Sequence, residues 1–144
     1  ELRMPVLLPD DFIPDVNIRL SFYKRIASAH DDVELDELKV ELIDRFGLLP
    51  DAARFLLQAA SRRQHAQKLG IKRIEGNERG GFIEFGEKNK VDPVYLIGLL
   101  QHQPQIFRLE GSSKLKFMQD LSDRSNRLKF IEQLLTDFEQ HRLG

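Results

Sequence analysis

The stretch "VELIDRFGLLPD", residues 40–51, constrains the fold more than any other part of the sequence. A glycine that directly follows an amphipathic run ends a helix, because glycine enters the left-handed backbone region at little cost. A proline fits the first turn of a helix, where its missing amide hydrogen is not needed. Gly47 and Pro50 therefore predict a corner between two helices. Such a corner needs neither Glu41 nor Asp44, so these two acids call for a separate explanation.

Two helices are predicted to meet at this corner, over residues 33–46 and about 51–69. Asp31 or Asp32 caps the first of them, and Gly70 ends the second. Their apolar residues recur at three and four positions, which predicts one buried side on each helix. The predicted inner residues are Leu35, Leu38, Leu42 and Phe46 on the first helix, and Phe55, Leu56, Ala59, Ala66 and Leu69 on the second.

Residues 1–13 are predicted to be an extended lead-in from a preceding linker, with residues 2–8 as an edge segment of a sheet, because Pro5 disfavours a helix there. Pro9 and Pro14 bracket a predicted turn. Pro14 then lies in the first turn of a helix that covers residues 15–29. Its apolar side is expected to consist of Leu20, Tyr23, Ile26 and Ala27. The sequence begins without methionine, which we interpret as a piece of a larger protein or a processed chain.

After Gly70 the apolar pattern changes from helical to strand-like. Residues 71–86 predict two short strands, roughly 71–75 and 82–86, around the loop "GNERGG". Residues 106–119 predict a second hairpin with Gly111 in its turn. The residues that alternate on its two strands are Phe107 and Leu109, and Leu115 and Phe117.

Two further helices complete the chain. Asp92 and Pro93 have the positions of a cap and a first helical residue, and this helix is expected to reach Leu100. The last helix covers about 122–141 and buries Leu128, Ile131, Leu135 and Phe138. About five helices on a small, largely antiparallel sheet, built from two hairpins plus the N-terminal edge segment, give an α+β fold in one domain, residues 1–144.

The composition excludes several classes of function. The net charge of −1 gives no global preference for nucleic acid or an anionic membrane, and no apolar run approaches the ~20 residues that span a bilayer. The absence of cysteine excludes thiolate chemistry and fits a cytoplasmic protein. The four histidines are scattered, and no glycine-rich loop has the lysine and the strand–helix context of a triphosphate site. We expect no catalytic, metal or cofactor site.

Four carboxylates on the helix 33–46 have the most informative spacing. Glu34, Glu37, Glu41 and Asp44 fall within about 80° of arc on a helix that turns ~100° per residue, on the side we expect to lie opposite the apolar residues. Like charges at this spacing destabilise a helix. Two readings remain: a solvated face, or a docking surface for a basic partner.

A basic group offers an alternative function. Arg62, Arg63, Lys72 and Arg73 lie close in sequence, near Lys68, and basic clusters bind phosphates. No aromatic residues alternate with them as stacking platforms. A solvated helix face and a nucleic-acid-binding accessory module are the two interpretations. A catalytic function would require a Glu or Asp side chain that meets a histidine in a pocket.

Four motifs resemble the C-terminal domain of the bacterial transcription-repair coupling factors. They are "RLSFYKRI" (19–26), "ELIDRFGLLPD" (41–51), "QKLGI" (67–71) and "FIEF" (82–85), in matching order and spacing. The helix after Ser122 adds little to the resemblance. The family's proteins are large DNA-dependent ATPases that push stalled RNA polymerase off damaged DNA. They then recruit UvrA through an N-terminal module that resembles UvrB.

The resemblance implies a regulatory role without catalysis in transcription-coupled nucleotide excision repair. The C-terminal domain is expected to fold back on the UvrB-like module of its own chain and to mask the UvrA-binding surface. RNA polymerase and UvrA are then indirect partners, and DNA contacts belong to other domains. Glu41 and Asp44, matched residue by residue, are implied as the acids of this autoinhibitory contact, with Glu37 and Glu34 beside them.

Overall fold

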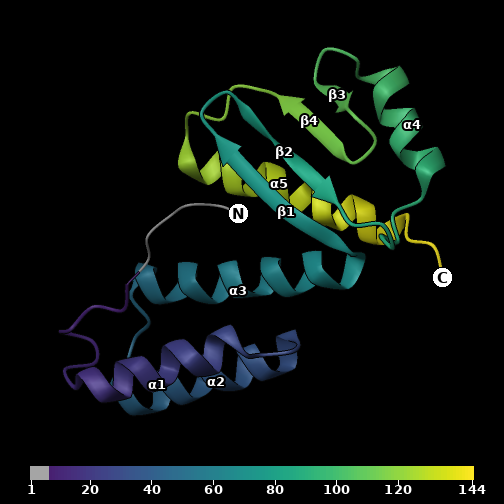
Figure 1. Cartoon of the computed structure of the whole chain (residues 1–144). Coiled ribbons are helices and arrows are strands. Elements are labelled where there is room, and N and C mark those ends of the chain that lie inside the picture. The colour runs from purple at the N-terminus through teal and green to yellow at the C-terminus, as the bar shows by residue number, and fades with distance from the viewer. Residues whose placement is uncertain (1–6) are drawn as a thin grey trace. The chain divides into compact units, whose positions relative to one another are not determined.

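The computed structural model describes residues 7–144, which form two compact units with separate hydrophobic cores. We call residues 7–64 the helical unit and residues 65–144 the sheet unit (Figure 1). The α+β class is confirmed, with five helices and one antiparallel sheet of four strands in the described residues. That both units belong to one domain, residues 1–144, stays a prediction.

The helical unit contains helix α1 (Val16–Ala27), helix α2 (Asp32–Phe46) and most of helix α3 (Asp51–Leu69). Asp31 caps α2 as predicted, because its carboxylate accepts the Glu34 amide at 2.9 Å. The apolar side of α2 is confirmed as well. The buried residues of this unit are Leu8, Ile13, Phe22, Ile26, Leu35, Leu38, Leu42, Leu49, Ala53, Leu57 and Ala60.

The predicted inner side of α1 is correct for Ile26 and wrong for Leu20 and Ala27. Phe22 and Ile26 are buried, whereas Leu20 is 50% exposed. The helix has two apolar stripes, and the sequence pattern alone does not decide between them. Contact with α2 does, because the Phe22 ring packs edge-on against Phe46 at a centroid distance of 6.0 Å.

The start of α1 also differs from the prediction. Pro14 precedes the N-cap, Asp15, whose carboxylate accepts the amides of Asn17 and Ile18 at 2.8 and 3.3 Å. The helix therefore begins after Asp15, because an aspartate satisfies its first amides better than a proline can.

The buried side of α3 agrees with the prediction at its end, where Ala66 and Leu69 are buried, but is rotated from the predicted one in its first half. The bounds agree with the prediction, but Ala53, Leu57 and Ala60 are buried and Phe55 is 39% exposed. Ala59 is half-buried. The small alanine side chains at 53 and 60 let α3 pack closely in this core, so the burial follows the small residues and leaves the aromatic ring at the surface.

The lead-in is only partly described. Residues 1–6, with most of the predicted edge segment, lie outside the described part of the chain. Residues 7–13 contain no strand, and residues 10–12 form the turn that was predicted between Pro9 and Pro14. The amides of Phe12 and Ile13 both donate to the Pro9 carbonyl, at 3.2 and 3.1 Å.

The sheet unit follows the predicted order of elements. The elements are strands β1 (Ile71–Asn77) and β2 (Gly80–Phe85), helix α4 (Pro93–His102), strands β3 (Phe107–Glu110) and β4 (Lys114–Met118), and helix α5 (Arg124–Gln140). The strand order is β1-β2-β4-β3, with every neighbour antiparallel. Helix α5 lies across one face of the sheet (Figure 1).

The core of the sheet unit confirms most predicted burial. Leu128, Ile131, Leu135 and Phe138 of α5 are buried, as are Leu115 and Phe117 of β4. Asp92 caps α4 as predicted, and this helix extends two residues beyond the expected end. Phe107 and Leu109 alternate on β3 as predicted, but Leu109 is half exposed, because β3 is a short strand at the edge of the sheet.

The loop predicted over "GNERGG" is shorter in the structure. The turn contains only Glu78 and Arg79, and the glycines pair within strands. A Cβ atom at Gly80 would lie 2.0 Å from the Phe117 carbonyl oxygen, and one at Gly81 would lie 1.9 Å from that of Glu75. These glycines therefore allow close approach of neighbouring strands, which loop propensity does not reveal.

The glycine stop at the helical corner is confirmed. Gly47 has φ 95° and ψ −155°, and its amide donates to the Ile43 carbonyl at 2.9 Å. This region of backbone space is essentially restricted to glycine. No atom lies within 4 Å of a Cβ built on Gly47, so the requirement comes from the backbone alone.

Replacement of Gly47 is expected to destabilise the protein through backbone strain. Gly47→Ala should lower the free energy of unfolding by about 1–3 kcal/mol, measured by urea denaturation. Gly47→Asn should be no milder, because asparagine tolerates only the ordinary left-handed region. Gly111→Asn is the matched control, since Gly111 has φ 66° and open space. Equal stability of Gly47→Ala and the wild type contradicts this assignment.

Candidate functional site

The four predicted acids of α2 lie beside the buried stripe and not opposite it. At ~100° per residue, the centre of their arc is about 120° from the centre of the stripe. Glu34 and Glu41 border the stripe and are half-buried, whereas Glu37 and Asp44 are exposed. The four carboxylates therefore have two different environments.

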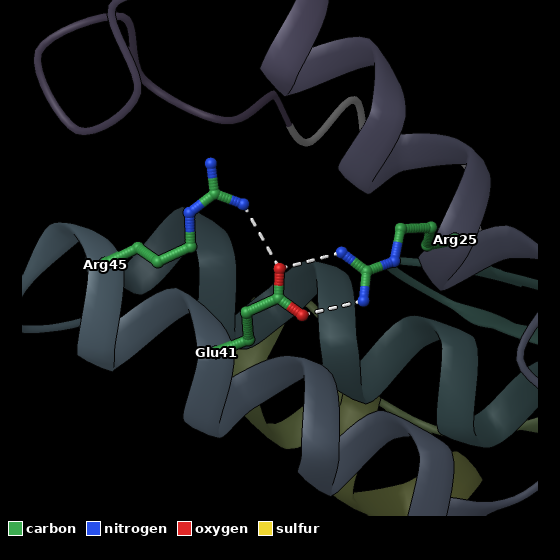
Figure 2. A network of polar contacts seen from close by, with 3 residues as sticks. All are labelled: Arg25, Glu41 and Arg45. Carbon is green, nitrogen blue, oxygen red and sulfur yellow. Dashed lines mark hydrogen bonds and ion pairs between the residues drawn. The ribbon is translucent and has the colours of Figure 1, made fainter.

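Glu41 is neutralised within the helical unit by two arginines. Arg25 of α1 donates to both carboxylate oxygens of Glu41, from Nη2 to Oε1 at 2.7 Å and from Nη1 to Oε2 at 2.9 Å. Arg45, one turn further along α2, donates to Oε2 at 3.2 Å. Figure 2 shows the carboxylate between the two guanidinium groups. A bidentate pair of this kind fixes orientation as well as charge.

Aromatic rings support both arginines. The Arg25 guanidinium carbon lies 5.1 Å from the centre of the Phe22 ring. The Arg45 guanidinium carbon lies 5.6 Å from the Phe22 ring centre and 5.1 Å from that of Phe46. Cation–π attraction at these distances restricts the two side chains further. The network therefore links α1 to the end of α2 by charge, hydrogen bonds and ring contacts.

The arginines change the acidity of Glu41. The hydrogen bond from Arg25 is the largest cause that lowers the pKa of Glu41 from 4.5 to about 2, and Arg45 contributes in the same direction. Partial burial opposes the change. The same bond raises the pKa of Arg25 above its ordinary value. Glu41 thus stays ionised far below neutral pH and is compensated there by two positive charges.

Glu34 also has a partner inside the unit. Its carboxylate Oε2 accepts the His30 amide at 2.9 Å, while its own amide donates to Asp31. This reciprocal arrangement is a variant of the capping box at the start of a helix. Glu34 therefore stabilises the entry into α2.

Glu37 and Asp44 are the acids that remain at the surface. The described part of the chain gives neither side chain a hydrogen bond or an ion pair. Exposed valines, Val33 and Val40, share their side of the helix at intervals of three and four residues, and Leu48 follows the corner with 93% exposure. This side of α2 therefore combines two acids without internal partners and exposed apolar groups.

The chain's relatives are transcription-repair coupling factors. The TRCF domain family model matches residues 2–96. The chain belongs to this family. It is 65% identical over 144 residues to the transcription-repair-coupling factor of Escherichia coli (strain K12), and 56% identical over 135 residues to that of Haemophilus influenzae. These matches cover 100% and 94% of the chain but only 12% of each relative.

The chain also matches a solved structure over nearly its whole length. It matches the crystal structure of the C-terminal domain of a transcription-repair coupling factor with a TM-score of 0.69 and 25% sequence identity. The match covers 97% of this chain and 94% of the other. The chain is therefore the C-terminal domain of a transcription-repair coupling factor, as the four sequence motifs indicated.

The basic residues predicted as a nucleic-acid contact have unequal environments in the TRCF domain. Arg62 is buried, at 7% exposure, which corrects its assignment to the surface. Arg73 pairs with Glu75 at 2.9 Å and lies over the Phe82 ring. Arg63 and Lys72 are exposed. A phosphate would have to compete with an internal carboxylate for Arg73, so the structure gives this alternative little support.

Other chemistry has no evident centre in residues 7–144. No group of three or more acidic or histidine side chains in this range is placed to hold a metal ion. None of the helices described there is long and apolar enough to cross a membrane. The predicted absence of catalytic residues stays a prediction.

Sequence reasoning missed the role of Arg25 and Arg45. The spacing of Glu41 and Arg45, four residues apart on one helix, is a signal that the sequence does contain. Arg25 comes from another helix, so its approach depends on how α1 packs against α2. The family motif pairs Glu41 with Asp44, whereas the geometry separates a compensated acid from an exposed one.

The network predicts a pH-dependent contribution to stability. Because folding lowers the pKa of Glu41, its contribution is complete above about pH 5 and is lost as pH falls toward about 2. Glu41→Gln should lower the free energy of unfolding by about 0.5–1 kcal/mol near pH 7, the upper range for surface ion pairs. The difference in unfolding free energy between Glu41→Gln and the wild type should disappear near pH 2. Urea denaturation at several pH values measures it.

The control for this prediction removes both arginines. In an Arg25→Gln, Arg45→Gln background, Glu41→Gln should produce little change across the same pH range. A difference between Glu41→Gln and wild type that does not vary with pH would show that the ion pairs do not contribute.

Proposed function

We propose that this chain is a regulatory domain without catalysis that docks on the UvrB-like N-terminal module of its own polypeptide. In the docked state it masks the surface through which that module binds UvrA, in transcription-coupled nucleotide excision repair. Membership in the TRCF family supports the repair context. The observation that carries the docking is the side of α2 with Asp44 and Glu37, two exposed carboxylates without an internal partner among the described residues.

The chemistry of this side predicts a basic partner surface with some apolar area. Asp44 and Glu37 would each meet a lysine or arginine, and the neighbouring Val33 and Val40 would lose contact with water. Charge complementarity of this kind gives orientation and specificity. It also excludes partners with acidic surfaces, because facing like charges repel.

Asp44 is the principal acid of the proposed contact, and Glu41 has an indirect role. A partner arginine would meet a Glu41 carboxylate whose charge Arg25 and Arg45 already compensate, so little net attraction would result. Glu41 instead holds Arg45, the neighbour of Asp44, in a fixed position over Phe22 and Phe46. The contact that recognises the partner and the contact that shapes the surface are therefore separate.

A weak contact is sufficient for this regulation. Interfaces between domains of one chain are small and polar compared with those of obligate complexes. A covalent tether supplies a high effective concentration, so a few charged contacts hold the closed state. A second partner, here RNA polymerase engaged by other domains of the parent, binds the undocked form with higher affinity and so shifts the protein out of the docked state.

The test compares acids on α2 in a full-length transcription-repair coupling factor that carries this chain as its C-terminal domain. Asp44→Lys should raise the affinity for UvrA most, Asp44→Ala less, and Glu41→Ala less than Asp44→Ala. Glu87→Ala is the control, because Glu87 is an exposed acid in the sheet unit, outside the helix that carries the proposed contact. UvrA binding is measured by calorimetry, with circular dichroism as the control for folding.

Two outcomes would contradict the proposal. Equal UvrA affinity for wild type and Asp44→Lys, with folding intact, would leave the acids as a solvated face. A larger effect of Glu41→Ala than of Asp44→Lys would place the recognition contact on the compensated acid and reverse the assigned roles.

A further inference from the structure

Four lysines from two separate parts of the chain meet at one end of the sheet unit. Two of them flank the turn between α3 and β1, and two lie in the loop between β2 and α4. Figure 1 shows that β1 starts and β2 ends at the same end of the sheet. All four side chains are exposed. We call these residues the lysine cluster, which consists of Lys68, Lys72, Lys88 and Lys90.

Backbone contacts hold the two parts of the lysine cluster together. The Lys90 amide donates to the Leu69 carbonyl at 2.8 Å. The Gly86 amide donates to the Gly70 carbonyl at 2.8 Å. Gly70 has φ 79°, and a Cβ built there would lie 2.6 Å from the Asn89 Cα, so only a residue without a side chain lets the loop approach this closely. The proximity of the four lysines is therefore a fixed property of the fold.

A β-bulge sets the position of Lys72. Its neighbours on β1, Ile71 and Arg73, pair with consecutive residues of β2, so no residue of β2 stands opposite Lys72. Bulges redirect the side chain that they carry. Here the Cγ atom of Lys72 lies 3.6 Å from a Cβ built on Gly86, at the start of the loop with the other two lysines. The bulge thus places the stem of Lys72 against that loop.

The lysine cluster has little internal compensation of its charge. Its ammonium groups have no hydrogen bond or ion pair within the described part of the chain. Residues 67–72 and 86–90 contain four lysines and one acid, Glu87, which gives these two segments a net charge of +3. The whole chain has a net charge of −1, so this is a local concentration of positive charge. Such a surface attracts partners with closely spaced negative charges.

The composition of the lysine cluster favours phosphates over an acidic protein surface. Protein interfaces are depleted in lysine and enriched in aromatic residues, methionine and arginine. The apolar side chains of the two segments are buried, with Leu69 0% and Ile71 6% exposed, so the segments offer no apolar area to a protein. Phosphate contacts need no apolar area, and a lysine ammonium group acts on them as a point charge.

The lysine cluster differs from the basic group that the sequence suggested. In that group Arg62 is buried and Arg73 already has a carboxylate partner. Lys88 and Lys90 were absent from it, because they come near Lys72 only once the β1–β2 hairpin has formed. Neither segment of the cluster contains an aromatic residue that could stack on unpaired bases, which favours a duplex over a single strand.

We propose that the lysine cluster binds the phosphate backbone of double-stranded DNA without regard to base sequence. Each lysine neutralises one phosphate and releases the cation bound there, so the affinity depends steeply on salt. Lysine contacts to phosphates carry no information about the bases. This proposal does not depend on the proposed docking through α2, because the cluster lies on other elements of the chain.

The test measures fluorescence anisotropy of a labelled duplex of about 20 base pairs as the chain is added, in salt from about 50 to about 200 mM. With four phosphate contacts, the logarithm of the association constant should fall with the logarithm of the salt concentration with a slope of about −3.6. The affinity at the high end should therefore be about 150-fold lower than at the low end. A·T-rich and G·C-rich duplexes should bind equally.

Two double variants separate the lysine cluster from general charge. Lys88→Gln with Lys90→Gln should weaken binding more than about tenfold in low salt and reduce the slope to about −1.8, because two phosphate contacts remain. Lys24→Gln with Lys39→Gln is the matched control, since it removes the same charge from exposed positions on α1 and α2. The control should keep the affinity and slope of the wild type. Circular dichroism checks that both variants are folded.

Three results would overturn the proposal. The first is a wild type that does not bind the duplex in low salt. The second is an equal loss of affinity in the two double variants. The third is tighter binding of a labelled poly-glutamate than of the duplex, lost in Lys88→Gln with Lys90→Gln, which would assign the lysine cluster to an acidic protein. The UvrA test of Asp44 gives its answer independently of all three.

Discussion

The bidentate contact between Arg25 and Glu41 determines what the helical unit presents to a partner. It joins α1 to α2 through two hydrogen bonds of 2.7 and 2.9 Å, and it draws Arg45 to the same carboxylate. The two guanidinium groups thereby lie over the Phe22 and Phe46 rings. Asp44, one turn away from Glu41, keeps its charge without an internal partner. The contact thus fixes the surface and decides which acid remains available.

Local signals in the sequence predicted the elements and most of their ends. Caps at Asp31 and Asp92, the glycine stop at Gly47 and the alternating residues of the second hairpin each act over a few residues, so a short window contains them. The inner sides of α1 and of the first half of α3 were predicted only in part, for a different reason. Each helix has more than one plausible apolar side, and only the neighbouring helices decide whether Leu20 or Phe22 is buried.

The candidate site was predictable in its residues but not in their roles. A helical projection identified the four acids, and the family motif selected Glu41 and Asp44. Neither approach assigned Arg25 to Glu41, because the two residues are sixteen positions apart and meet only through helix packing. Counting charges on one helix therefore overestimated its negative surface. Half of the acidic arc is compensated or used in capping before any partner arrives.

The proposed docking contact on α2 depends on the attraction between exposed charges. Salt therefore weakens it, since the screening length is roughly 8–10 Å near physiological ionic strength. An autoinhibitory contact that must open benefits from this kind of force, because a competing charge can replace it.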